Sequence, residues 1–72
     1  MNVMTIKSWK QKLINIALDY YWNSSSRYDE QVLDATINDI ENMIPSDIDS
    51  TESYKDIVSE LMHENMLRLN HL

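Results

Sequence analysis

The segment IKSWKQKLINIALDYYW, residues 6–22, decides the fold class of this 72-residue chain. Apolar residues recur in it at alternating spacings of three and four positions, the period of one face of an α-helix; they are Ile6, Trp9, Leu13, Ile16 and Tyr20. The pattern predicts a helix over residues 6–22, with Thr5 or Ser8 as its N-cap. We therefore expect an all-α protein built outward from this helix.

Three consecutive aromatic residues, Tyr20, Tyr21 and Trp22, close this segment. Successive helical residues are turned by about 100°, so the three side chains fan over roughly 200° of the helix surface. Tyr20 belongs to the first stripe, whereas Leu18, Tyr21 and Trp22 continue a second apolar strip that begins at Ile14. Two interpretations follow. Either two neighbouring helices cover both strips, or the second strip contacts a partner protein or a second copy, where Tyr and Trp are enriched.

A second helix is predicted over residues 27–44, beyond the polar run NSSS at residues 23–26. Ser26 is its expected N-cap, and Pro45 is expected to end it because proline cannot continue the hydrogen-bond ladder. The predicted apolar stripe consists of Leu33, Ile37, Ile40 and Ile44, widened by Val32 and Met43.

A third helix is predicted over residues 51–69, after the turn-rich stretch PSDIDSTES at residues 45–53. Ile48 is expected to anchor this stretch to the core, and Asp49 with Glu52 offers a capping pair for a helix that starts near Ser50 or Thr51. The side chains expected to face inward are Tyr54, Ile57, Val58, Leu61, Met62, Met66, Leu67 and Leu69.

Three helices joined by short links predict a single domain, residues 1–72, folded as a small antiparallel three-helix bundle. The lack of glycine disfavours β-hairpins, which need positive φ angles in their turns. A domain of this size buries only about 60% of the surface of its unfolded chain. Because the chain has no cysteine to form disulfides, completion of the core by dimerisation is the alternative to a self-sufficient monomer.

Charge is unevenly distributed around a net value of −6. Residues 1–27 carry four cations against one carboxylate (+3), and residues 28–72 carry two cations against eleven carboxylates (−9). In the predicted third helix, Asp56, Glu60 and Glu64 follow one another at i, i+4 and i+8 and so form an acidic ridge. The ridge either faces solvent alone or steers a partner protein with a basic surface.

Nucleic-acid binding is the alternative hypothesis, in the form of a dimeric regulator. Lys7, Lys10, Lys12 and Arg27 would supply phosphate contacts from the basic face of the first helix. The net charge of −9 on residues 28–72 would repel a duplex, so nucleic acid is the less favoured partner.

The sequence contains no pattern typical of an enzyme, and we predict no catalytic, cofactor-binding or metal-binding residue. Glu60 and His63 have the spacing found in carboxylate-bridged metal bundles, but the motif occurs once where such sites need it twice. No glycine-flanked serine nucleophile is present. No apolar run approaches the length of a membrane span, and with the absence of cysteine this indicates a cytoplasmic protein.

These observations predict a small acidic protein-binding module, a regulator, inhibitor or adaptor that covers a partner protein. Leu18, Tyr21 and Trp22 would anchor the contact, and the acidic ridge would steer it. The profile resembles that of many bacterial immunity proteins, antitoxins, secretion co-chaperones and phage-encoded inhibitors. Because this resemblance is one of composition without a shared motif, it assigns no role to any residue.

Overall fold

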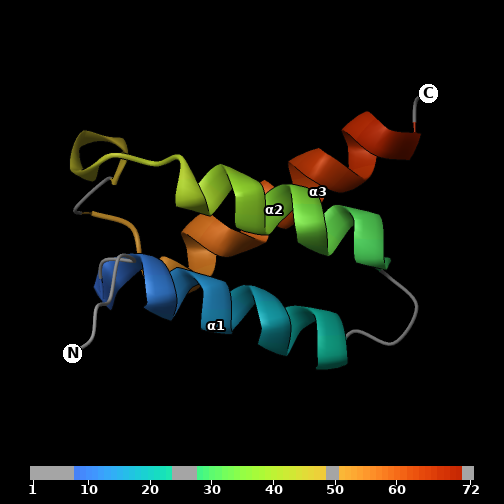
Figure 1. Cartoon of the computed structure of the whole chain (residues 1–72), viewed down its shortest axis with the longest axis horizontal. Coiled ribbons are helices and arrows are strands. Elements are labelled where there is room, and N and C mark those ends of the chain that lie inside the picture. The colour runs from blue at the N-terminus through green and yellow to red at the C-terminus, as the bar shows by residue number, and fades with distance from the viewer. Residues whose placement is uncertain (1–7, 24–27, 49–50, 71–72) are drawn as a thin grey trace, which may run out of the picture.

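The computed structural model of the protein describes residues 8–23, 28–48 and 51–70. They form α1 (Ser8–Asn23), α2 (Glu30–Glu41), a short 3₁₀ helix η1 (Pro45–Asp47) and α3 (Tyr54–Asn70). α1 and α2 run antiparallel, and α3 crosses behind them obliquely (Figure 1). Each α-helix contacts both of the others. The predicted all-α three-helix bundle is therefore confirmed.

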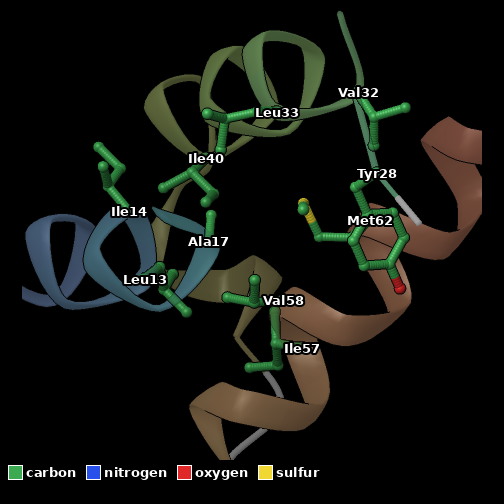
Figure 2. Close-up of a cluster of buried hydrophobic side chains, with 10 residues drawn as sticks. All are labelled: Leu13, Ile14, Ala17, Tyr28, Val32, Leu33, Ile40, Ile57, Val58 and Met62. Carbon is green, nitrogen blue, oxygen red and sulfur yellow. The ribbon is translucent and has the colours of Figure 1, made fainter. Parts of the chain in front are cut away.

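The buried face of α1 lies between the two apolar strips recognised in the sequence. Leu13 and Ala17 are completely buried and Ile14 nearly so, whereas Trp9, Ile16 and Tyr20, predicted to form the main stripe, are only half-buried. Figure 2 shows Leu13 on the side of α3 and Ile14 on the side of α2, with Ala17 between them. α1 packs against both other helices, as one of the two interpretations expected, and Trp9, Ile16 and Tyr20 pack against the edge of the core.

α2 is shorter at its N-terminus than the predicted range of 27–44. The N-cap is Asp29, whose carboxylate oxygen accepts a hydrogen bond from the backbone N–H of Val32 at 3.0 Å. The expected N-cap, Ser26, lies outside the described residues. Asp29 outcompetes an earlier start because an N-cap carboxylate satisfies an otherwise unpaired amide and also favours the positive end of the helix dipole.

α2 also ends earlier than predicted. Asn42 takes the C-cap position, and its side-chain amide donates to the backbone oxygen of Asn38 at 2.9 Å. Ile44 has an extended backbone, because the residue before a proline avoids helical geometry. Its side chain is 57% exposed, so its assignment to the core stripe was wrong. Pro45 instead opens η1, where Asp47 accepts a hydrogen bond from the Ile44 N–H at 2.9 Å.

α3 covers Tyr54–Asn70 instead of the predicted residues 51–69. The Ser53 hydroxyl accepts a hydrogen bond from the backbone N–H of Asp56 at 3.2 Å, so Ser53 caps a helix that begins later than the expected start near Ser50 or Thr51. Asp49 and Ser50 lie outside the described residues. The buried apolar residues of α3 are Ile57, Val58 and Met62, as predicted.

Leu67 departs from the predicted core of α3, because 46% of it is exposed. It follows Glu60 by seven residues and Glu64 by three, so helical geometry places it on the outer face with them. The expectation for Ile48 is met, since this residue is half-buried and packs against the core from the link between α2 and α3.

A buried polar contact joins α2 to α3. Thr36 is completely buried and Asn65 is 3% exposed. The Asn65 side-chain nitrogen donates to Thr36 Oγ1 and to Asp39 Oδ2, each at 3.0 Å, and Arg68 donates to Asn65 Oδ1. Every polar atom of the Asn65 side chain thus has a partner, as burial requires. Sequence reasoning did not identify this contact.

Candidate protein-binding surface

The C-terminal end of α1 presents the largest exposed apolar residue of the described chain. Trp22 is 75% exposed, whereas Leu18 and Tyr21 are half-buried and pack against the core. The rings of Tyr21 and Trp22 meet edge to face, with centroids 5.5 Å apart and planes inclined at 71°. We call Leu18, Tyr21 and Trp22 the aromatic end of α1.

The helical period explains why Tyr21 turns inward and Trp22 does not. Tyr21 follows the buried Ala17 by four residues and therefore returns close to the same face. Trp22 is turned a further ~100° around the axis, toward solvent. Helical side chains lean toward the N-terminus of their helix, so Trp22 lies above the turn that contains Leu18 and Asp19. The expected separation of the three aromatics is therefore confirmed, with Trp22 outermost.

A pocket of about 260 Å³ adjoins this turn, between α1 and the start of α3. It is lined by Ile16, Asp19, Tyr20, Asn23 and Lys55. The Tyr20 hydroxyl donates a 3.4 Å hydrogen bond to the backbone oxygen of Lys55, which holds the two helices together at this point. Asp19 precedes Trp22 by three residues and Asn23 follows it directly. The pocket therefore lies on the last two turns of α1, and none of Leu18, Tyr21 and Trp22 lines it.

The acidic ridge on α3 lies on the outside of the bundle. Asp56, Glu60 and Glu64 are all exposed, and within the described residues no ion pair neutralises them. Leu67 extends the same face by one turn. No hydrogen bond, ion pair or ring contact within the described residues joins the ridge to the aromatic end. The carboxylates of the ridge and the Trp22 ring are therefore both accessible to solvent.

Lys10, one of the four cations named in the nucleic-acid hypothesis, contacts the end of α2 in the structure. The Lys10 ammonium donates to the backbone oxygen of Glu41 at 2.7 Å and lies 5.6 Å from the ring centroid of Trp9. A cation in this position satisfies a free carbonyl and favours the negative end of the α2 dipole. Lys12 is exposed, and Lys7 and Arg27 lie outside the described residues. Lys10 therefore has a structural role in joining α1 to α2.

No cluster of three or more His, Asp or Glu side chains in the described residues could hold a metal ion. Glu60 and His63 are both exposed. Among the described helices, none combines the length and the apolar character required to cross a bilayer.

Comparisons with protein-family models, curated proteins and solved structures returned no match for this chain.

Proposed function

We propose that this protein is a non-enzymatic binding module, a regulator, inhibitor or adaptor that acts in the cytoplasm by covering a partner protein. The observation that carries the proposal is the 75% exposure of Trp22, which exceeds the 57% of Ile44 and the 46% of Leu67, the other large apolar residues that the described chain leaves exposed. A tryptophan can bury 150–250 Å² in a contact, roughly 4–6 kcal/mol of apolar transfer at ~25 cal/mol per Å² before the costs of association. Trp22 is therefore well suited to anchor an interface.

Leu18 and Tyr21 are the core-facing residues of the aromatic end, and the Tyr21 ring contacts the Trp22 ring. Both pack against the core, so the exposed ring stands on a rigid base, and a rigid anchor loses little conformational entropy on binding. The pocket beside Asp19 adds a concave feature into which a partner side chain can insert. Anchors of this kind, aromatic and close to a pocket, dominate the energy of many interfaces.

The acidic ridge supplies the electrostatic part of the proposal. Asp56, Glu60 and Glu64 are accessible carboxylates in a chain of net charge −6. They would attract a partner with a basic surface and raise the association rate, an effect that salt would screen. We expect the ridge to act at a distance or at the rim of the contact.

A site-directed cross-linking experiment tests this function. A photoreactive phenylalanine derivative replaces Trp22 in cells of the source organism, and a matched variant carries it at Gln31, an exposed position on the outer face of α2. We expect one protein to be cross-linked from position 22 and not from position 31. With both proteins purified, Trp22→Ala should weaken the complex at least about tenfold, the loss expected at a hot spot.

Two results would contradict the proposal. Equal labelling of the partner from both positions, or an unchanged affinity of the Trp22→Ala variant, would show that the aromatic end is not the contact. If the chain is cross-linked to itself, and its mass in sedimentation rises from that of a monomer to that of a dimer as the concentration increases, the aromatic end is the interface of a homodimer.

A further inference from the structure

The electrostatic surroundings of Trp22 restrict the chemistry of the group that can cover it. The last turn of α1 contains no basic residue, and the carbonyls of a helix C-terminus present the negative end of the helix dipole. Among the described residues, the Asn23 side-chain amide donates to the backbone oxygen of Asp19 at 2.9 Å. Asp19 adds an exposed carboxylate one turn before Trp22, on the side over which the ring leans. The surface beside the ring is thus negative and accepts hydrogen bonds.

The start of α2, which follows α1 in the chain, carries two carboxylates. Asp29 is the N-cap, where its carboxylate accepts a hydrogen bond from the Val32 N–H, and Glu30 lies in the first turn. The described segment 28–48 contains no Lys, Arg or His. Lys55 lines the same pocket as Asp19 but forms no ion pair with it among the described residues. Charge complementarity therefore favours a cation as the group that contacts this surface.

The aromatic rings favour a cation as well. The face of an indole ring carries the negative part of its quadrupole and attracts cations more strongly than the ring of Tyr or Phe does. Tyr21 meets Trp22 edge to face, which fixes the orientation of the indole and leaves most of it in water. A flat cation can then lie on the Trp22 face while its N–H groups reach the Asp19 carboxylate.

We infer that the aromatic end of α1 receives an arginine side chain of a partner protein, with the guanidinium stacked on Trp22 and hydrogen-bonded to Asp19. Guanidinium is the side-chain group that combines stacking on an aromatic face with forked donation to a carboxylate. An ammonium matches the charge but lacks both the planar face and the fork. This inference rests on the proposed function and specifies the partner residue that Trp22 binds.

A titration followed by NMR tests the inference without knowledge of the partner. The probe is N-acetyl-arginine amide, and the matched probe is the citrulline analogue, which keeps the shape and loses the charge. Substitution of each tryptophan by phenylalanine assigns the two indole N–H signals. We expect the arginine probe to shift the Trp22 signal and not that of Trp9, and to bind more tightly than citrulline by about two- to fivefold, the cation–π contribution at an exposed site.

Two variants define the contact further. Asp19→Asn should reduce the preference for arginine over citrulline, whereas Glu41→Gln, which removes one carboxylate from the far end of α2, should leave it unchanged. Trp22→Leu, which keeps an apolar side chain but removes the ring, should abolish the preference. The N-acetyl-lysine amide should bind more weakly than the arginine probe.

Several outcomes would overturn the inference. Equal shifts with citrulline or leucine amide would show that the surface is merely apolar, and larger shifts with adenosine monophosphate would show that it stacks bases. Arginine-dependent shifts that appear only in an Arg27→Gln variant would show that an arginine of this chain occupies the site. In each case cross-linking from position 22 still decides the protein-binding function independently.

Discussion

The side-chain amide of Asn65 on α3 donates a 3.0 Å hydrogen bond to the hydroxyl of Thr36 on α2, inside the core of the bundle. Asp39 accepts the second amide proton at 3.0 Å. A buried polar pair of this kind tolerates only the helix alignment in which its partners meet, because any other alignment leaves polar groups unpaired. The contact therefore selects how α3 crosses α2.

The first prediction concerns the stability provided by this contact. Asn65→Ala should lower the free energy of unfolding by about 2–3 kcal/mol, since it removes the hydrogen bonds to Thr36, Asp39 and Arg68 and leaves the Thr36 hydroxyl buried without this partner. Thr36→Val should cost only about 1 kcal/mol, because Asp39 still accepts from Asn65. Urea denaturation measures both values. A loss below about 0.5 kcal/mol for Asn65→Ala, the range of ordinary surface substitutions, would contradict the assigned role.

The second prediction concerns Lys10. Lys10→Met keeps most of the apolar stem but removes the donor to the Glu41 carbonyl, so it should destabilise the fold by about 0.5–1.5 kcal/mol. The matched variant Lys12→Met changes an exposed lysine on the same helix and should have an effect within about 0.5 kcal/mol of zero. Thermal and urea unfolding provide the comparison. Equal effects of the two substitutions would mean that the Lys10 contact contributes nothing specific.

The third prediction separates binding from folding. Because Trp22 is 75% exposed, Trp22→Ala should change the free energy of unfolding by less than about 0.5 kcal/mol. Leu13→Ala, in contrast, opens a cavity in the core and should cost about 2–5 kcal/mol. Acrylamide should quench the Trp22 fluorescence more strongly than that of Trp9. Strong destabilisation by Trp22→Ala would show that the ring supports the fold and would remove the main argument for a binding role.

The fourth prediction concerns the acidic ridge. Glu60→Gln combined with Glu64→Gln removes a repulsion between like charges at i and i+4, so the fold should be unchanged or more stable by up to about 0.5 kcal/mol. The same variant should bind the partner more slowly at low salt, and the difference should shrink as salt is added. Stopped-flow association over a range of salt concentrations measures this. An unchanged association rate would show that the ridge does not steer the partner and is only a solvent-facing helix surface.

The fifth prediction concerns nucleic acid. The engagement of Lys10 with Glu41 and the net charge of −9 on residues 28–72 lead us to expect no retention on random duplex DNA at low salt. A filter-binding or electrophoretic assay checks this. Retention with a steep salt dependence, reduced by Lys12→Gln, would revive the hypothesis of a nucleic-acid regulator.

Local sequence predicted which segments are helical but placed their ends inaccurately. Ser53 caps α3 and Asp29 caps α2, yet the sequence contains several other Ser, Thr and Asp residues near each start. Each of them offers a similar capping energy, of order 1 kcal/mol. Which one is used depends on where the helix must begin in order to pack, and this is decided by tertiary contacts.

The candidate surface was also predictable only in part: the sequence indicated which residues face outward but not which of them pack against neighbouring helices. Helical periodicity separates Trp22 from the buried Ala17 face and places Asp56, Glu60 and Glu64 in one line. It does not show that Leu18 and Tyr21 pack against the core, or that Lys10 reaches the end of α2. These facts depend on which helix lies on which side of α1, and no local pattern specifies that.

The sequence by itself determined the helical class, because apolar spacing, capping residues and the proline act over a few positions along the chain. Only the tertiary structure decided that Ala17 is the centre of the α1 interface, that Asn65 and Thr36 meet, and that Leu67 and Ile44 remain exposed. The physical reason is that burial is a property of three helices together. A periodic pattern limits which residues face inward, whereas the arrangement of the neighbouring helices fixes which of them lose contact with water.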